Sequence, residues 1–239
     1  MLALPLLYWC VNVELAFEVC CVFLSSMWCN STLKELFRVP RPPLSSVKGW
    51  AFPSGHAQGT SSFWGYLAFF RPSALTFKLF AAAIIVLVAI SRVYLGVHWP
   101  SDVVGGIVIG LGWAYLLSRP GRLRAGRSAA WLCAGVLLYL LFSGGDSSAP
   151  AGALQGLALG HLGQKKWIDM DTCGPMTQKV WRYLVGLGVM SLVLFGLRAI
   201  LPGSVGFRFL RYLATGFGAT FVAPWLFVLT GLAKARTGR

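Results

Sequence analysis

Residues 91–102 read SRVYLGVHWPSD and join two long apolar stretches of the sequence. This joining segment carries Arg92, His98 and Asp102. Ionisable groups beside hydrocarbon are costly, so they are usually absent, paired or retained for a function. The segment therefore predicts two membrane helices joined by a turn that bears a functional site.

The composition extends the membrane prediction to the whole chain. The 239 residues are 56% hydrophobic and only 12% charged, with a mean hydropathy of +0.69, a composition far from that of average soluble proteins. A spanning helix needs roughly 20 mostly apolar residues. We predict an all-α fold, a polytopic transmembrane helical bundle, whose apolar stretches lie at about 15–33, 55–70, 79–97, 101–118, 128–142, 149–163, 182–201 and 208–232.

The formal charge of +14 could indicate a nucleic-acid partner, but the distribution of the basic residues along the chain fits a membrane topology better. We therefore expect no nucleic-acid partner. The basic residues lie mostly in turns, and 13 of the 21 fall on one side when the helices are taken in order. The positive-inside rule makes that side cytoplasmic, so residues 91–102 face outward. The thirteen are Arg71, Lys78, Arg119, Arg122, Arg124, Arg127, Lys165, Lys166, Lys179, Arg182, Lys234, Arg236 and Arg239.

The six cysteines do not predict a metal site or a disulfide framework. None of them makes a CxxC or a zinc-ligand spacing, and most lie in apolar helix, where cysteine acts as a small hydrophobic residue. A glycosylation sequon, Asn30-Ser31-Thr32, lies near a membrane-embedded helix end, which speaks against its use.

Two more polar segments fall on the predicted outer side. The first, KELFRVPRPP at 34–43, ends a helix with prolines and holds Lys34 and Arg41 near the membrane surface. The second, FPSGHAQG at 52–59, opens the next helix, with Ser54 at the N-cap and Gly55 permitting close backbone approach. Such a helix start is a ready anion site because its first N–H groups are unpaired.

Three segments therefore converge on one face and predict chemistry on phosphate. Asp102 follows His98 by four residues, so in a helical turn its carboxylate returns to the imidazole and fixes the tautomer. Three cations suit a multiply charged tetrahedral anion, and two histidines suit a nucleophile and a proton donor. The cations would repel a divalent ion, so we expect no metal and no cofactor.

The motifs resemble those of the type 2 phosphatidic acid phosphatase (PAP2) superfamily, which includes acid phosphatases and vanadium haloperoxidases. The family signature is K-x6-RP, then PSGH, then SR-x5-H-x3-D. Here it reads Lys34 with Arg41-Pro42, then Pro53-Ser54-Gly55-His56, then Ser91-Arg92 with His98 and Asp102. Every motif position matches across about 70 residues.

This resemblance implies a metal-independent histidine phosphatase. It implies that His98 attacks phosphorus to form a phosphohistidine, that Asp102 orients His98, and that His56 protonates the leaving oxygen and then activates water. The resemblance gives the task of binding phosphate to Lys34, Arg41, Ser54, Gly55 and Arg92.

The resemblance also implies a domain organisation. Residues 1–143 form the expected catalytic membrane core, whose first helix is cut short because the apolar segment Met1–Cys10 is too short to span a membrane. Residues 144–239 form further transmembrane helices, whose role the motifs leave open.

The substrate is less closely defined than the chemistry. A site on helix ends at the outer surface suits a phosphate headgroup whose tail stays in the bilayer. GWAFPSGHAQ at 49–58 also resembles the second motif of dolichyl-diphosphate phosphatases, which favours a polyprenyl substrate such as undecaprenyl diphosphate. Phosphatidic acid, diacylglycerol diphosphate and phosphatidylglycerophosphate remain alternatives.

Alternatives to hydrolysis also stay open. The same phosphohistidine would serve a phosphotransferase that passes phosphate to a lipid or sugar, and a non-catalytic lipid-phosphate binder is a third reading. A composition rich in Ala, Gly, Leu and Arg is typical of bacteria, so we expect a bacterial cytoplasmic membrane, with the site on its extracytoplasmic side. Membrane lipids are expected partners, and a homo-oligomer is left open.

Overall fold

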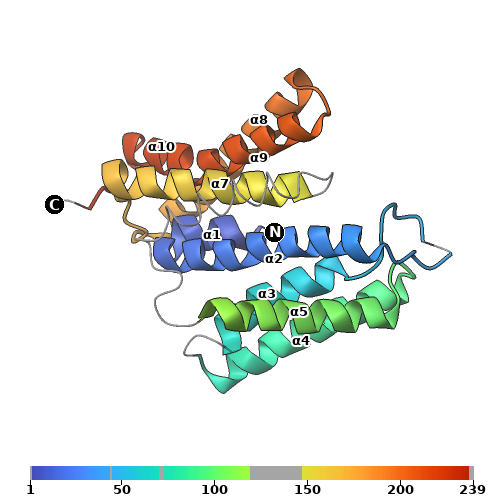
Figure 1. Ribbon diagram of the computed structural model, residues 1–239. Coiled ribbons are helices and arrows are strands. Elements are labelled where there is room, and N and C mark those ends of the chain that lie inside the picture. The colour runs from blue at the N-terminus through green and yellow to red at the C-terminus, as the bar shows by residue number, and fades with distance from the viewer. Residues whose placement is uncertain (1, 44, 70–72, 119–146, 237–239) are drawn as a thin grey trace. The chain divides into compact units, whose positions relative to one another are not determined.

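The computed structural model describes residues 2–43, 45–69, 73–118 and 147–236 (Figure 1). Every regular element within these ranges is a helix apart from one antiparallel bridge between Met170 and Ala235, which confirms the predicted all-α class. Five of the helices are long and apolar enough to cross a membrane, as expected for an integral membrane protein. The predicted basic turn 119–127, the apolar stretch 128–142 and Cys133 lie outside the described residues.

The chain forms two compact units, one of residues 22–123 and one of residues 1–21 together with 124–239. The predicted boundary between 1–143 and 144–239 falls outside the described residues, so that division stays a prediction.

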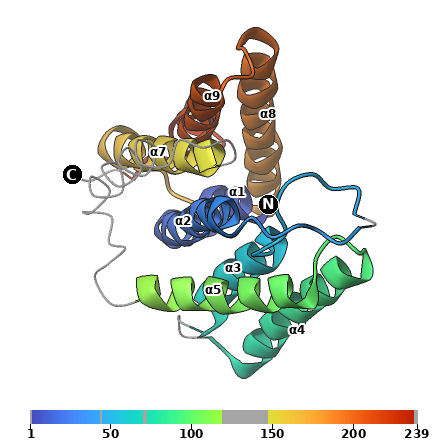
Figure 2. The ribbon, with the colours of Figure 1, turned by 45° about the vertical axis from the view of Figure 1, so that its right-hand side comes forward.

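The 22–123 unit carries the three motifs. It contains α2 (Val13–Phe37) from Val22 onward, α3 (Gly55–Phe69), α4 (Leu75–Tyr94) and α5 (Pro100–Ser118). These helices match the apolar stretches predicted from the sequence. In both ribbon views α3, α4 and α5 lie side by side (Figure 1, Figure 2).

Close packing of α3 on α5 depends on two glycines one turn apart in α5. A Cβ atom on Gly106 would lie 2.7 Å from the Ser54 carbonyl oxygen, and one on Gly110 would lie 2.9 Å from the Ser61 Cβ. Small residues at this spacing let the backbones of membrane helices approach closely. The contact brings the first turn of α3 beside the first turn of α5, where the second and third motifs lie.

Helix α4 covers α3 through aromatic side chains and leaves its other face open. The Trp64 ring lies 5.5 Å from that of Phe80 at an interplanar angle of 86°, an edge-to-face geometry that aromatic pairs favour. Leu79, Leu87 and Ile90 are exposed, as expected of a helix that faces lipid.

The other unit is a second helical bundle. Its elements are α1 (Ala3–Cys10), the start of α2, α7 (Ser148–Gly163), the π-helical turn η3 (Gln164–Ile168), α8 (Met176–Ile200), α9 (Val205–Phe217), the π-helical turn η4 (Gly218–Val222) and α10 (Ala223–Leu229). Within the apolar segment at the start of the chain, Ala3–Cys10 forms a short helix, and its Tyr8, Trp9 and Cys10 side chains are buried in this unit.

Arg182 is the first residue of the predicted apolar stretch 182–201 and one of the thirteen basic residues assigned to the cytoplasmic side. It lies in α8 and is fully buried. Its guanidinium donates hydrogen bonds to the carbonyl oxygens of Leu232 at 2.7 Å, Thr172 at 2.9 Å and Cys173 at 2.8 Å. Buried polar groups require such partners, so this arginine joins α8 to two backbone segments of its unit and does not serve as a surface topology signal.

Candidate active site

The first motif lies where α2 ends. Arg38 takes a left-handed backbone conformation with a φ of 49°, which ends the helix just after Phe37. Lys34, in the last turn of α2, donates to the carbonyl oxygens of Trp50 at 2.7 Å and Ala51 at 3.2 Å. The lysine therefore ties the end of α2 to the chain that leads into the second motif.

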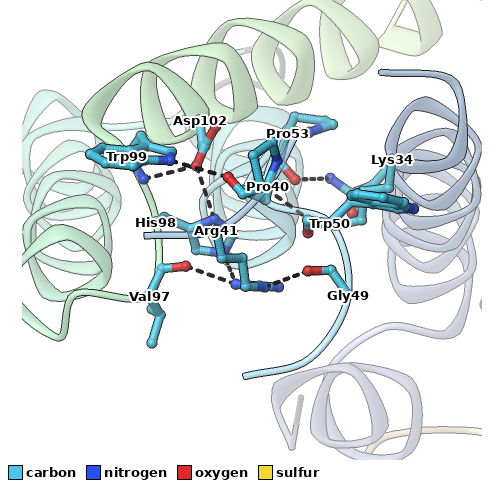
Figure 3. A network of polar contacts seen from close by, with 12 residues as sticks. Lys34, Pro40, Arg41, Gly49, Trp50, Pro53, Val97, His98, Trp99 and Asp102 are labelled. Carbon is cyan, nitrogen blue, oxygen red and sulfur yellow. Dashed lines mark hydrogen bonds and ion pairs between the residues drawn. The ribbon is translucent and has the colours of Figure 1, made fainter. Parts of the chain in front are cut away.

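Arg41 follows in the extended segment and reaches across to the third motif. Its Nε donates to the Gly49 carbonyl oxygen at 3.0 Å, and one terminal nitrogen donates to the Val97 carbonyl oxygen at 2.8 Å. The same terminal nitrogen lies 3.3 Å from Nε2 of His98 (Figure 3). The prolines that stop α2 thus leave this arginine placed against a histidine far along the chain.

The second motif forms the start of α3, as predicted. Gly55 is the first residue of the helix, and Ser54 stands at the N-cap position. The Ser54 hydroxyl is fully buried and makes no hydrogen bond among the described residues, so it does not act as a side-chain cap. The amides of Gly55 and His56 have no carbonyl one turn earlier in the helix to bond, which makes them donors for an anion.

The third motif brings His98 and Asp102 together. Nδ1 of His98 lies 3.4 Å from Oδ2 of Asp102, and both side chains are buried. The same carboxylate oxygen accepts the backbone N–H of Trp99 at 2.8 Å. Helix α5 begins at Pro100 as predicted, and the carboxylate on its third residue reaches back to the N-cap amide, as in a capping box.

These contacts favour one tautomer of His98. A guanidinium can only donate, so the contact from Arg41 requires a lone pair on Nε2 of the imidazole. The proton of the neutral ring then resides on Nδ1, which faces the Asp102 carboxylate. Nε2 is left with its lone pair, beside a cation.

The charges of the site keep His98 neutral. Burial first, and then the charges of Arg41 and Lys34, lower the pKa of His98 to about 4 although Asp102 raises it. A neutral imidazole at physiological pH is the form that can act as a nucleophile.

His56 lies within reach of all three predicted cations. Its side chain is exposed, yet partial desolvation and the charges of Arg92, Arg41 and Lys34 lower its pKa from the usual value. Arg92, in the last turn of α4, donates from Nε to the Ser91 hydroxyl at 3.2 Å. A histidine among three cations is a good proton donor once a polyanion binds, because the anion's charge offsets theirs.

The structure therefore brings the eight predicted site residues to one end of the 22–123 unit. They come from the end of α2, the segment after it, the start of α3, and the α4–α5 turn. Among the described residues, no group of three or more His, Cys, Asp or Glu side chains is placed to hold a metal ion.

Sequence reasoning missed the residues that support this site. The Trp99 indole N–H donates to the Pro40 carbonyl oxygen at 3.2 Å and so connects the third motif to the first. Asn30, which matches a glycosylation sequon, is buried and hydrogen-bonded to the second motif. Gln58, the last residue of the stretch that resembles the second motif of dolichyl-diphosphate phosphatases, is buried against α2. The only signal for Asn30 and Gln58 was their polarity inside apolar stretches.

Comparison with known proteins places these motifs in a family. Residues 15–122 match the PAP2 superfamily, and residues 148–235 match the transmembrane extension of PAP2 superfamily phosphatases. The described helices that follow residue 147 thus correspond to a recognised extension of such phosphatases.

Three curated relatives illustrate the similarity. The chain is 39% identical to a phosphatidylglycerophosphatase B of Bacillus subtilis, over 38% of this chain and 50% of the relative. It is 33% identical to a probable sphingosine-1-phosphate phosphatase of Dictyostelium discoideum, over 46% and 32%, and 39% identical to an undecaprenyl-diphosphatase of Sulfolobus acidocaldarius, over 29% and 32%.

The chain spans half the length of the first of these relatives and about a third of the other two. No solved structure matches the chain significantly. The two family matches together extend over most of the sequence and agree with the three motifs. The chain belongs to the PAP2 superfamily.

Proposed function

We propose that the chain is a membrane-embedded lipid phosphatase that hydrolyses a lipid phosphate or diphosphate through a phosphohistidine on His98. One observation carries the proposal. Nε2 of His98 lies 3.3 Å from the Arg41 guanidinium, while Nδ1 faces Asp102 at 3.4 Å. The nitrogen that would attack phosphorus thus lies beside a cation that can bind a phosphoryl oxygen.

The reaction has two steps. In the first, Nε2 of His98 attacks the terminal phosphorus in line, and the bond from that phosphorus to the oxygen that carries the rest of the lipid breaks. This oxygen belongs to the lipid alcohol in a monophosphate and bridges the two phosphorus atoms in a diphosphate, and His56 gives its proton to it. In the second, His56 takes a proton from water as the water oxygen attacks, the P–N bond breaks, and inorganic phosphate leaves. Asp102 stabilises the charge that His98 acquires in the first step.

The phosphoryl oxygens are held by the cations and by the start of α3. Lys34, Arg41 and Arg92 supply positive charge, and the buried Ser54 hydroxyl supplies a hydrogen-bond donor. The amides of Gly55 and His56 add backbone donors. Donors fixed before the reaction stabilise the charge that develops in the transition state, which is commonly the largest single contribution to catalysis.

A lipid substrate is supported by the surroundings of the site. Phe37, Tyr94 and Leu95 lie next to the motif residues and leave 53%, 88% and 57% of their surface exposed. Exposed apolar side chains at the ends of membrane helices suit a phosphate whose tail remains in lipid.

Our best choice of substrate is a polyprenyl diphosphate such as undecaprenyl diphosphate. The relatives named above act, by their names, on three different lipid phosphates, so similarity alone supports the class more than the compound. Phosphatidic acid, diacylglycerol diphosphate and phosphatidylglycerophosphate are the alternatives, and transfer to an acceptor would use the same intermediate.

We place the protein in the bacterial cytoplasmic membrane with the site on the extracytoplasmic side. The charge bias supports this orientation.

The deciding experiment measures inorganic phosphate released from undecaprenyl diphosphate in detergent with EDTA present. Wild type and His98→Ala are compared at equal folded concentration. Release by wild type alone supports the histidine mechanism and the polyprenyl substrate. Release by both proteins contradicts the role of His98. If wild type releases nothing from this lipid, the glycerophospholipid phosphates are tested next, and then transfer to an added acceptor.

A further inference from the structure

The peptide unit between Pro53 and Ser54 is held at both ends. Its carbonyl oxygen accepts a hydrogen bond from Nδ2 of Asn30, on α2, at 3.1 Å. Its N–H donates to the Asp102 carbonyl oxygen, on α5, at 2.9 Å. The plane of this peptide immediately precedes Gly55 and His56, so it sets the direction of the first donors of α3.

Asn30 is itself held by a second buried amide. Its Nδ2 also donates to Oε1 of Gln58 at 2.9 Å, so the two protons of this nitrogen have two acceptors. Nε2 of Gln58 in turn donates to the carbonyl oxygen and the hydroxyl of Ser26, at 2.8 Å and 3.1 Å. All three side chains are buried, and an amide whose donors are all engaged has a single orientation.

This chain of amides connects the first and second motifs. Asn30 lies one helical turn before Lys34 on α2, so the two side chains leave the same face of the helix. Gln58 lies in the first turn of α3, two residues after His56. The spacing between the phosphate-binding lysine and the donors of α3 is thus set by side-chain hydrogen bonds as well as by apolar packing.

We propose that Asn30 and Gln58 are positioning residues that fix the phosphate-binding turn at residues 53–56. This inference rests on the proposed function, because it assigns a task to groups that do not touch the reacting atoms. The physical reason is geometric sensitivity. A displacement of about 1 Å at a catalytic group can lower the rate roughly 100-fold, and apolar packing alone fixes a turn less narrowly than directed hydrogen bonds.

The test must separate positioning from helix packing. Asn30→Leu keeps the approximate volume of the side chain and removes both donated bonds. Gln58→Leu leaves the Asn30 bond to Pro53 in place and removes the bonds of Gln58 to Asn30 and Ser26. Trp113→Phe is the matched control. It removes another hydrogen bond between helices of the same unit, from the Trp113 indole to the Ser25 hydroxyl at 2.9 Å, without touching the turn.

The readout is the affinity of the folded proteins for orthovanadate, measured by calorimetry in detergent beside kcat, KM and the melting temperature. Vanadate adopts a five-coordinate geometry like that of a phosphoryl transition state. We expect Asn30→Leu to weaken vanadate binding about tenfold or more and to lower kcat by a similar factor. Gln58→Leu should show a smaller loss, and Trp113→Phe should bind vanadate as wild type does while melting earlier.

Equal vanadate affinities in Asn30→Leu and Trp113→Phe would overturn the inference. If Asn30→Leu does not fold, Gln58→Leu decides the matter, and wild-type affinity in that variant has the same consequence. Different results would contradict the proposed function. These are a wild-type protein that binds vanadate but releases no phosphate from any lipid phosphate, or a His98→Ala variant that keeps its activity.

Discussion

Two buried histidines in this chain each have a carboxylate near one ring nitrogen, but their other nitrogens meet different groups. In the 22–123 unit, Nδ1 of His98 lies 3.4 Å from Asp102, and Nε2 meets the Arg41 guanidinium. In the other unit, Nε2 of His161 lies 3.7 Å from Glu14, and Nδ1 meets the Tyr8 hydroxyl at 3.0 Å. The carboxylate therefore does not distinguish the two.

The faces of the two rings differ as well. The Phe17 ring stacks on His161 with a centroid distance of 4.0 Å and an interplanar angle of 13°. The Tyr8 ring meets it at 74° with centroids 6.1 Å apart. His161 is fully buried between these rings, so a phosphorus atom has no in-line path to either nitrogen.

The carboxylates are also balanced differently. Glu14 is paired with Lys165 at 2.5 Å, and Lys165 also contacts Asp169 at 3.3 Å. Asp102 is instead bonded to a backbone amide at the start of α5. A histidine beside a carboxylate is thus a nucleophile only where its free nitrogen faces anion-binding donors, and His161 is better explained as part of the packing of its unit.

The largest expected effect is the loss of activity in His98→Ala. We expect phosphate release to fall at least about 10³-fold, since the proposed mechanism forms its covalent intermediate on His98. The melting temperature should change little, because the variant leaves Asp102 bonded to Trp99. Burst experiments with a radiolabelled phosphate should show no acid-labile phosphoprotein. Undiminished phosphoprotein in this variant would place the nucleophile elsewhere.

Asp102→Asn should have the next largest effect. The amide oxygen can still accept the Trp99 N–H, so the start of α5 should remain formed. The change removes the charge that stabilises the His98 cation, and we expect kcat to fall about 10²-fold. The measurement is steady-state kinetics beside a circular dichroism melt. A variant with normal kcat would show that the 3.4 Å contact only caps the helix.

The sequence was sufficient to predict the end of the 22–123 unit that carries the motifs. Lys34, His56 and His98 are spread over 64 residues of sequence. Each lies near a helix end that is predicted by prolines, a glycine or an N-cap residue. The order of the apolar stretches along the chain then predicts which helix ends share a side. Local signals of this kind survive without tertiary information.

The supporting contacts were not predictable in the same way. Asn30 matched a glycosylation sequon, and only the position of α3 shows that its amide is buried against Pro53. Arg182 was predicted at the start of an apolar stretch and assigned to the cytoplasmic side, and only the packing of α8 shows that its side chain is fully buried. His161 drew no notice inside an apolar stretch. In each case a contacting residue lies far away in the sequence: Pro53 for Asn30, Leu232 for Arg182 and Tyr8 for His161.

The pH dependence should show how the cations affect the two histidines that we propose to be catalytic, His98 and His56. With the pKa of His98 lowered to about 4, kcat/KM should rise as the pH increases through about 4 and the nucleophile loses its proton. It should fall again as His56 is deprotonated, below the usual pKa of 6.5 in the free protein. In kcat the fall should come at higher pH, because bound phosphate favours the protonated form.

His56→Gln is the control for this profile. Glutamine cannot exchange a proton in this range, so the alkaline limb should disappear while the acidic limb near pH 4 remains. An unchanged alkaline limb would assign that titration to another group and remove His56 from the role of proton donor.

His161→Ala should alter stability and leave the chemistry almost unchanged. Removing a fully buried ring that Phe17 and Tyr8 contact leaves a cavity, and we expect a loss of about 2–3 kcal/mol in unfolding free energy. The kcat of the folded fraction should stay within about twofold of wild type. A thermal or denaturant melt in detergent checks the first expectation. A large loss of kcat in fully folded His161→Ala protein would mean that His161 takes part in the reaction.

The smallest expected effect is that of Lys165→Ala. Lys165 and Glu14 form an ion pair whose side chains are 29% and 44% exposed, so solvent screens it, and such pairs are worth about 0.5 kcal/mol. We expect a small fall in melting temperature that shrinks further in high salt, with kcat unchanged. Glu14→Gln is the companion variant, since it removes the same pair from the other side while keeping an acceptor near His161. If either change lowered stability by as much as His161→Ala, Glu14, His161 and Lys165 would act as one buried network. The two histidine sites would then differ only in that, among the described residues, His161 has no anion-binding donors beside it.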